Sequence, residues 1–364
     1  MNIIYIHKAE VHKRPPVLSV LMHLSALKFR VHLITCGISD EVRERLEAMG
    51  ICIHVLPYSS GGNKFKKIVD YISFRKKAYD IINQIYKEDS LLWIESGYTI
   101  VALGKRVNKY KFVLQIQELH ENDPLTLHAI GKVIHSAKAV FMPEYNRCVL
   151  YQLKYRLRHR PILLPNIPAF LPLEKDLERY INKYNEYLQK IKDKIVVVYQ
   201  GYIIGADRPL DNYVRALKEL GDKYQLVLIG KAGKELNDYI SILPDLIHVD
   251  FVPSPEYLFF TKNAHIGIVS YDPMILNNAY CAPNKVFEYS NYGLPMIGNN
   301  IPGLKGLIEY YNAGKLVDEH SVEDIRNQIN DIVDNYDYYS QHSRSLLSQF
   351  DNKETIWNVL DSLE

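Results

Sequence analysis

Short apolar runs alternate with longer amphipathic stretches along most of the chain, and this alternation limits the fold more than any other feature. Runs of roughly four to eight aliphatic residues are typical of buried strands, whereas the stretches between them carry apolar side chains at helical spacing. Consecutive parallel strands need a crossover, which a helix of this length supplies. We expect strands at 2–7, 30–36, 52–58, 91–95, 111–117, 137–142, 195–200, 224–230, 247–252, 264–271, 296–297 and 314–317.

The length of 364 residues predicts two domains rather than one. A proline-rich segment, 161–168, lies between the sixth and seventh expected strands and marks the boundary between them. The sequence therefore predicts an α/β fold with two Rossmann-like parallel-sheet domains, at 1–168 and 169–345, followed by a terminal helix at 346–364. A single charged helix is expected over 172–192, because its apolar residues have helical spacing.

Residues 280–303 bring together a helix start, a cation and a carboxylate. Pro283 opens an expected helix and Gly293 ends it. Unpaired N–H groups at a helix start attract phosphate, and Lys285 adds a positive charge in that first turn. Glu288 follows one turn later, where a carboxylate can accept hydrogen bonds from two ribose hydroxyls. The segment predicts a nucleoside-diphosphate site; an ordinary β-α-β unit with a proline cap and a glycine stop is the alternative.

This segment resembles the nucleotide-sugar signature of GT-B glycosyltransferases, specifically the retaining, family-4-like enzymes of bacterial surface polysaccharide synthesis. The shared pattern, Pro-Asn-Lys-x-x-Glu-Tyr-x-x-x-Gly-x-Pro, runs from Pro283 to Pro295. Many relatives carry two glutamates separated by seven residues; Glu288 stands at the second position, and Tyr280 occupies the first. The resemblance implies a GT-B arrangement, in which two sheets face each other across a cleft and the terminal helix crosses back to the N-terminal domain.

The resemblance also implies that the C-terminal domain binds the donor. A glycine loop from Gly201 to Gly205 follows the strand at 195–200 and leads to Arg208. A strand, a glycine loop and a helix start form an anion site, so Arg208 and Lys285 are the expected catalytic cations for the diphosphate of a UDP- or GDP-linked sugar. The other implied donor contacts are Gly201, Tyr202, Lys231, Val252, Tyr280, Cys281, Ala282, Pro283, Asn284 and Glu288.

Charged side chains follow two expected strands of the N-terminal domain. Lys13 and Arg14 come after the first strand, at the sheet edge where open α/β folds bind ligands, and they are candidates for acceptor binding. His120 and Glu121 follow the fifth strand, where relatives have a His-Glu pair near the acceptor and the reacting sugar. The resemblance implies a catalytic role for this pair. A solvated loop at Lys13 and Arg14, and helix capping beside a surface histidine, are the alternatives.

Charge is divided unevenly along the chain. Residues 1–166 carry 25 lysines and arginines against 14 acidic residues, a net charge of +11, whereas residues 167–364 carry 19 against 28, a net charge of −9. A basic half predicts contact with an anionic surface. The stretch 64–77 mixes lysines with aromatic residues and is compatible with a helix on an anionic bilayer. Scattered solvated lysines and an ordinary surface helix are the alternatives. No nucleic-acid partner is expected.

The cysteines and the absence of certain motifs limit which cellular compartment and which cofactors are expected. The four cysteines show no metal-ligand spacing and no close pair, which predicts buried free thiols in a reducing compartment. No signal peptide is visible, and no run approaches the ~20 apolar residues of a membrane span. We therefore expect a cytoplasmic protein, working at the inner face of the cell membrane. The sequence has neither an Asp-x-Asp motif nor a Gly-x-Gly-x-x-Gly fingerprint, so no metal and no cofactor are expected.

These observations predict a metal-independent glycosyltransferase that moves a sugar from a nucleotide diphosphate-sugar to a saccharide acceptor, with a lipid-linked acceptor suggested by the basic half. Retention of anomeric configuration is implied by the resemblance alone. Two other functions stay open. A nucleotide-sugar 2-epimerase of the same architecture would use Glu118, His120 and Glu121 as acids and bases. A non-catalytic nucleotide-sugar binder would need none of them.

Overall fold

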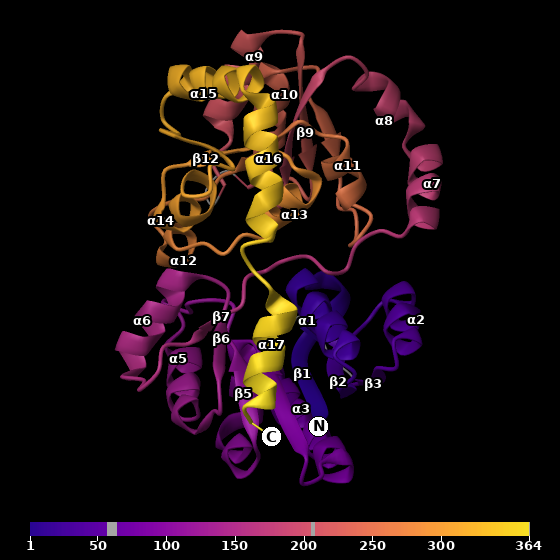
Figure 1. Ribbon diagram of the computed structural model, residues 1–364, viewed down its shortest axis with the longest axis vertical. Coiled ribbons are helices and arrows are strands. Elements are labelled where there is room, and N and C mark those ends of the chain that lie inside the picture. The colour runs from indigo at the N-terminus through magenta and orange to yellow at the C-terminus, as the bar shows by residue number, and fades with distance from the viewer. Residues whose placement is uncertain (57–63, 205–207, 364) are drawn as a thin grey trace. The chain divides into compact units, whose positions relative to one another are not determined.

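The computed structural model describes residues 1–56, 64–204 and 208–363. The chain forms two compact units, of which unit 1 is Met1–Ala169 with Asp351–Glu364 and unit 2 is Phe170–Phe350 (Figure 1). The sequence predicts domain boundaries after residues 168 and 345, and the two units meet after residues 169 and 350. The end of the third expected strand, at 57–58, and Gly205 of the glycine loop lie outside the described residues.

Unit 1 is built on a seven-stranded sheet in the order β3-β2-β1-β4-β5-β6-β7, here called sheet A, whose neighbouring strands all pair in parallel. The strand order reverses between β1 and β4, which is the point where open α/β sheets bind ligands. The strands are β1 (Asn2–Glu10), β2 (Arg30–Gly37), β3 (Cys52–Val55), β4 (Ser90–Glu95), β5 (Phe112–Gln115), β6 (Val140–Met142) and β7 (Ile162–Leu163).

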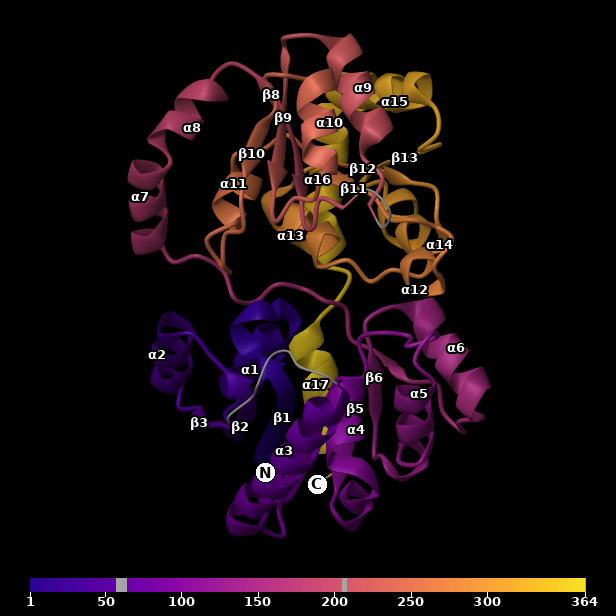
Figure 2. The same ribbon diagram turned by 180° about the vertical axis from the view of Figure 1, so that it is seen from behind.

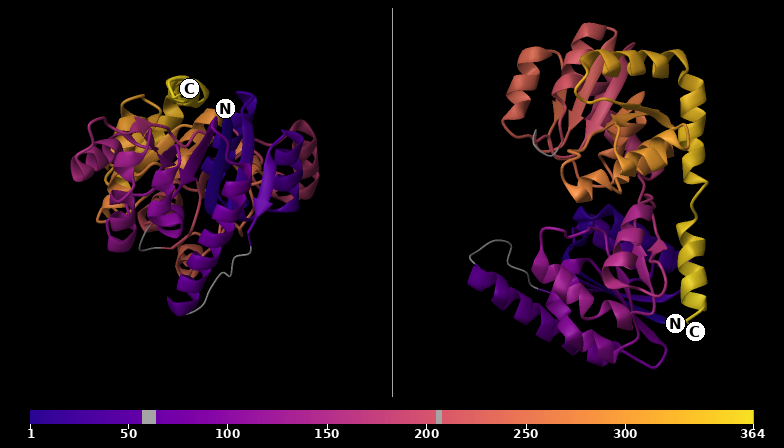
Figure 3. Two further views of the ribbon diagram at one scale, coloured as in Figure 1. Left: turned by 90° about the horizontal axis from the view of Figure 1, so that it is seen from below. Right: turned by 90° about the vertical axis from the view of Figure 1, so that its left-hand side faces the viewer.

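Helices cover both faces of sheet A, with α3 and α17 on opposite sides (Figure 3). The terminal helix α17 belongs to unit 1: the Trp357 ring stacks on Phe29 with ring centroids 6.2 Å apart, and Asn352 Nδ2 donates to the Pro165 carbonyl at 2.7 Å. The helices of unit 1 are α1 (Pro15–Ala26), α2 (Asp40–Ala48), α3 (Lys64–Ile85), α4 (Gly97–Leu103), α5 (Pro124–Gly131), α6 (Tyr145–Tyr155) and α17 (Asn352–Asp361), with short 3₁₀ turns at η1 (Val11–Lys13), η2 (Gly104–Lys109) and η3 (Ile134–Ser136).

Unit 2 contains a six-stranded parallel sheet, sheet B, in the order β10-β9-β8-β11-β12-β13. Alternate residues of β8 enter two different cores, Val198 on one face and Val197 on the other, so the strand is apolar throughout. The strands are β8 (Ile195–Gln200), β9 (Tyr224–Ile229), β10 (Ile247–Val249), β11 (Ile266–Val269), β12 (Met296–Asn299) and β13 (Gly314–Val317).

The helices of unit 2 cover both faces of sheet B (Figure 2). The prediction of one helix over 172–192 was wrong, because the helix breaks at Tyr184. The Tyr184 ring packs on Phe260, with centroids 4.7 Å apart, and its hydroxyl bonds to Glu256 at 2.8 Å. The helices are α7 (Glu174–Lys183), α8 (Asn185–Lys190), α9 (Asp211–Leu220), α10 (Glu235–Ile242), α11 (Leu258–Lys262), α12 (Leu276–Ala279), α13 (Asn284–Tyr292), α14 (Pro302–Leu304), η4 (Lys305–Glu309), α15 (Val322–Asp334) and α16 (Tyr336–Leu347).

The predicted α/β class with two Rossmann-like parallel sheets is confirmed. The expectation that the cysteines are buried was wrong for Cys52, which is exposed because β3 is the edge strand of sheet A; Cys36, Cys148 and Cys281 are buried. No helix among the described residues combines the length and the apolar character needed to cross a membrane.

Candidate functional site

Two glycines shape the carboxyl edge of sheet B. Gly201 follows β8 with φ of 142°, and Gly230 follows β9 with φ of 130°. A Cβ on Gly230 would lie 2.1 Å from the Gly201 carbonyl oxygen, so the two loops approach more closely than any side chain would allow. The Ile203 amide donates to the Lys231 carbonyl at 2.9 Å and holds the loops together. The backbone at these strand ends is therefore open to a ligand and fixed in position.

Two cations gather beside these loops around one aromatic ring. Lys285 Nζ lies 4.1 Å from the centre of the Tyr199 ring and 5.4 Å from that of Tyr271. The Arg208 guanidinium lies 4.1 Å from the same Tyr271 ring and donates to Asn278 Oδ1 at 3.5 Å. The two cations that the sequence singled out come from segments 77 residues apart, and the structure brings them together.

Burial disfavours the charged form of Lys285 in this cluster. Lys285 is only 8% exposed. Desolvation, and then repulsion from Arg208, lower the pKa of Lys285 to about 7, although Glu288 and Cys281 act in the opposite direction. A group whose charged form is disfavoured in this way is stabilised by any anion that enters. The site is therefore electrostatically prepared for a polyanion such as a diphosphate.

Glu288 lies within a buried hydrogen-bond network rather than open to solvent. Its carboxylate accepts from Gln200 Nε2 and from the Tyr257 hydroxyl, and Gln200 Oε1 in turn accepts from Thr261 Oγ1 at 2.6 Å. Burial raises the pKa of Glu288 to about 7, against the influence of Tyr257, Lys285 and Gln200. Each carboxylate oxygen has a second lone pair, so the network orients the group and leaves acceptor capacity for a ligand hydroxyl.

The helix that carries Lys285 and Glu288 begins one residue later than expected. Pro283 has extended backbone angles (φ −74°, ψ 124°) and is the N-cap of α13, which starts at Asn284 with no side chain bonded to the cap. The N–H groups of its first turn therefore have no side-chain acceptor of that kind. Gly293 ends the helix in the left-handed region at φ 68°, as predicted.

The loop before α13 is held by a close backbone contact. Cys281 is buried, and a Cβ on Gly303 of α14 would lie 2.5 Å from the Cys281 amide nitrogen. The partly exposed members of the loop and the helix start are Tyr280, Ala282 and Asn284. Only glycine at position 303 allows this approach, so α14 packs against the loop before α13 and fixes its position.

The remaining expected donor contacts lie on the loops that follow β8, β9 and β10. Tyr202 and Lys231 are exposed, and Val252 is half-buried. Lys231 Nζ lies 5.8 Å from the centre of the exposed Phe251 ring. An apolar and a cationic side chain are thus available at the same edge of the sheet for a base and a phosphate.

At the carboxyl edge of sheet A, His120 is held in a constrained backbone conformation with φ of 56°. Its ring meets Tyr98 edge-on at 5.4 Å, and a Cβ on Gly97 would lie 2.5 Å from His120 Nε2. Burial lowers the pKa of His120, although the neighbouring acids raise it, so the imidazole is neutral at pH 7. Glu121 is half-buried beside it.

The other polar groups of this edge divide into two kinds. Lys13 is exposed and forms an ion pair with Glu10, and Arg14 is exposed just before α1. The buried pair His7 and Glu95 was not predicted from the sequence. His7 Nδ1 hydrogen-bonds to the Glu95 carboxylate, and His7 Nε2 has no hydrogen-bond partner among the residues that the structure describes. Both residues lie inside apolar strands, and their register, His7 opposite Glu95, is visible only in the sheet.

Comparison with known proteins bears on the fold. No protein-family model matches the sequence. An uncharacterised glycosyltransferase of Haemophilus influenzae is 23% identical over 307 residues, which are 79% of this chain and 76% of that protein. The crystal structure of Anabaena Alr3699/HepE in complex with UDP-glucose matches with a TM-score of 0.73 at 12% identity, over 100% of this chain and 99% of that one.

A second solved structure is that of WaaG, a glycosyltransferase involved in lipopolysaccharide biosynthesis. It matches with a TM-score of 0.65 at 13% identity, over 99% of each chain. The resemblance to GT-B glycosyltransferases that the 283–295 pattern suggested is thereby confirmed, and the chain has the GT-B fold. The narrower resemblance to retaining, family-4-like enzymes stays a prediction.

Proposed function

We propose that this chain is a glycosyltransferase that takes its sugar from a nucleoside diphosphate-sugar, with UDP-linked sugars as the first candidates. One observation carries the proposal: Arg208 and Lys285 flank the Tyr271 ring at the carboxyl edge of sheet B, beside the start of α13. The GT-B fold and the UDP-glucose complex of the similar Anabaena protein support the choice of donor.

The chemistry needed at this site is stabilisation of a leaving diphosphate. As the bond between the anomeric carbon and the phosphate oxygen breaks, negative charge grows on the diphosphate. Fixed cations and backbone N–H groups aimed at that charge lower the barrier. Arg208, Lys285 and the first turn of α13 supply them without a metal ion. Glu288, held by Gln200 and Tyr257, accepts hydrogen bonds from the ribose hydroxyls and is not the catalytic base.

The acceptor half of the reaction is assigned to the carboxyl edge of sheet A. The neutral imidazole of His120 can hydrogen-bond an acceptor hydroxyl, with Glu121 beside it and Lys13 and Arg14 at the same edge. In a retaining reaction the acceptor oxygen bonds to the anomeric carbon on the face that the diphosphate leaves. The acceptor proton then passes to a phosphate oxygen of the leaving group.

A lipid-linked acceptor at the cytoplasmic membrane face is supported by α3. Ile68, Val69 and Ile72 of this helix are 57%, 49% and 59% exposed, and they are followed by the exposed Lys76 and Lys77. An apolar strip next to lysines suits a helix that lies in the interface of an anionic bilayer. Ile72→Asp should abolish sedimentation with phosphatidylglycerol vesicles, whereas Leu125→Asp, at a 67% exposed site on α5, should not. Equal binding of the two variants would contradict the assignment.

The transfer reaction itself is tested by incubating the protein with UDP- and GDP-sugars, with and without a lipid-linked saccharide, and measuring the nucleoside diphosphate released. We expect the release of nucleoside diphosphate to depend on the acceptor. Removal of metal ions should slow this release less than loss of Lys285 does. Lys285→Ala should raise the donor Kd at least tenfold, about 1.4 kcal/mol. Unchanged donor affinity in that variant would contradict the placement of the diphosphate.

A nucleotide-sugar 2-epimerase is the second candidate, and the buried His7–Glu95 pair, whose Glu95 is the last residue of β4, favours it because proton removal from a sugar needs closely placed acids and bases. The two functions separate when the donor is supplied alone. An epimerised sugar nucleotide without any acceptor would support the epimerase, whereas an unchanged donor that reacts only with acceptor supports the transferase.

A further inference from the structure

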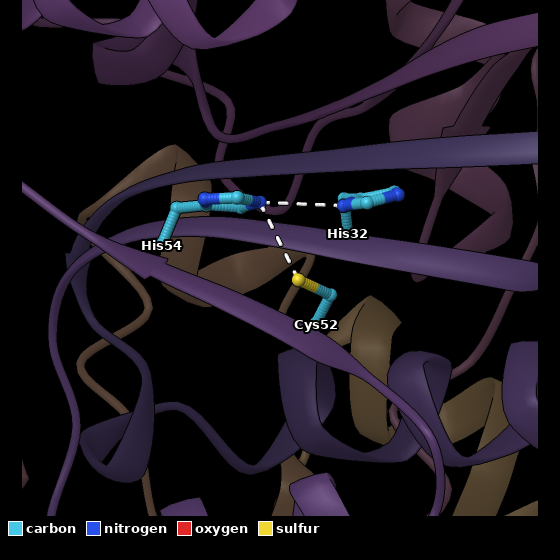
Figure 4. A group of neighbouring side chains, drawn as sticks. All are labelled: His32, Cys52 and His54. Carbon is cyan, nitrogen blue, oxygen red and sulfur yellow. Dashed lines mark hydrogen bonds between the residues drawn. The ribbon is translucent and has the colours of Figure 1, made fainter. Parts of the chain in front are cut away.

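Three side chains with metal-binding atoms meet on one face of sheet A, at its β3 edge. Cys52 and His54 are two residues apart on β3 and therefore point to the same side. His32 of β2 is the register partner of Cys52 and joins them from the neighbouring strand (Figure 4). The cluster lies at the third residue of β2 and at the first and third residues of β3, whereas the proposed acceptor groups follow β1 and β5.

The distances within this cluster match the edges of a zinc coordination tetrahedron. His32 Nδ1 lies 3.3 Å from His54 Nε2, and Cys52 Sγ lies 3.7 Å from the same nitrogen. Zn–N bonds of ~2.0 Å and a Zn–S bond of ~2.3 Å at tetrahedral angles give N···N edges of ~3.3 Å and N···S edges of ~3.5 Å. All three ligand atoms lie within 4.8 Å of one another, so the third edge, between His32 Nδ1 and Cys52 Sγ, needs to close by ~1.3 Å at most.

The donor set selects the kind of metal. Two imidazole nitrogens and a thiolate suit Zn²⁺, whereas Mg²⁺ and Ca²⁺ require oxygen ligands. Hydrogen bonds account for this arrangement less completely than a shared metal ion does. The single atom His54 Nε2 would have to bond to both the His32 nitrogen and the Cys52 sulfur. Arg30 and Lys87 add positive charge near His32. The negative charge that a bound cation needs would therefore come from Cys52, whose thiol gives up its proton when it binds the metal.

We propose that His32, Cys52 and His54 bind one Zn²⁺ ion, with water in the fourth position. The ion ties the edge strand β3 to β2 in unit 1. β3 is four residues long, with none of its side chains buried, so a cross-link to β2 stabilises an otherwise weakly held edge. The site is separate from the diphosphate cluster of unit 2, and neither depends on the other.

Cys52 gives a direct readout in the native full-length protein, because the other three cysteines are buried. The protein is stripped with a chelator, and the rate at which Cys52 reacts with a thiol reagent is measured at increasing Zn²⁺. We expect one equivalent of Zn²⁺ to slow the reaction at least tenfold and Mg²⁺ to leave it unchanged. Co²⁺ in place of Zn²⁺ should give the absorption of a tetrahedral thiolate complex.

Variants decide whether the three residues act together. His54→Gln should remove the zinc protection of Cys52, whereas His320→Gln, at an 84% exposed histidine of unit 2, should leave it intact. Zn²⁺ should also raise the Tm of the native protein and not that of Cys52→Ser, which reports the site without thiol chemistry. Protection that survives His54→Gln, or a native protein whose thiol rate and Tm ignore Zn²⁺, would overturn the proposal.

Discussion

Binding of UDP should be coupled to the uptake of a proton by Lys285. The pKa of this lysine is lowered to about 7 by burial and by Arg208, so at pH 8 only roughly one molecule in ten carries the charge. A diphosphate beside Nζ favours the charged form and therefore raises the pKa of Lys285 back towards the ordinary lysine value of ~10.4. Binding at pH 8 therefore takes up close to one proton, ~0.9 per UDP.

The affinity must follow the same linkage. When one proton is taken up on binding, Kd rises tenfold per pH unit, or about 1.4 kcal/mol, between pH 8 and 9. Glu288, with a pKa raised to about 7, is largely ionised in this range and adds little. The measurement is titration calorimetry in two buffers of different ionisation enthalpy, which gives the number of protons directly.

Lys285→Arg is the matched control, because a guanidinium stays charged at these pH values and still binds phosphate. This variant should bind UDP with no proton uptake and with a Kd that does not change between pH 8 and 9. Uptake that persists in Lys285→Arg, or that is missing from the native protein, would refute the assignment of the diphosphate to this lysine.

Two further predictions concern the same cluster. Lys285→Met should raise the stability of the ligand-free protein by about 1–3 kcal/mol at pH 7 while weakening UDP binding at least tenfold, because it removes a buried charge. Since the folded pKa of Lys285 lies below its unfolded value, the native protein should gain stability from pH 7 towards pH 10, and Lys285→Met should lose this slope in denaturant titrations; a parallel slope would contradict the buried charge. Gly230→Ala should lower the free energy of unfolding by about 3 kcal/mol or more and weaken UDP binding, because its Cβ meets the Gly201 carbonyl. Gly221→Ala, with φ of 79° and open space around it, should lower the free energy of unfolding by only about 1–2 kcal/mol. Similar losses of stability for the two variants in thermal unfolding would count against the loop contact.

The elements that the sequence predicted well are those whose signal is local. Strands such as Ile195–Gln200 are apolar on both faces, and Gly293 ends α13 through its own backbone freedom. The helix break at Tyr184 had no local signal, because it follows from packing against Phe259 and Phe260, which are distant in the sequence.

The site divides in the same way. Lys285, Glu288 and Arg208 were predicted from the sequence because a helix start and a glycine loop are typical of an anion site. Their surroundings were not found, since Gln200, Tyr257 and Thr261 come from separate segments that meet only in the folded unit. The prediction that no metal is bound relied on the absence of an Asp-x-Asp motif and of metal-ligand spacing between cysteines, and it stays a prediction. The strand register that places His32 opposite Cys52 cannot be read from the sequence.

Recognition of a diphosphate by the cation cluster of unit 2 underlies the proposed function. Its most direct test is the affinity of the native protein and of Lys285→Met for UDP and for UMP, measured by calorimetry at pH 7. We predict that the native protein prefers UDP over UMP at least tenfold and that the variant binds the two almost equally. A native protein without preference for UDP, or a variant that keeps it, would contradict the account.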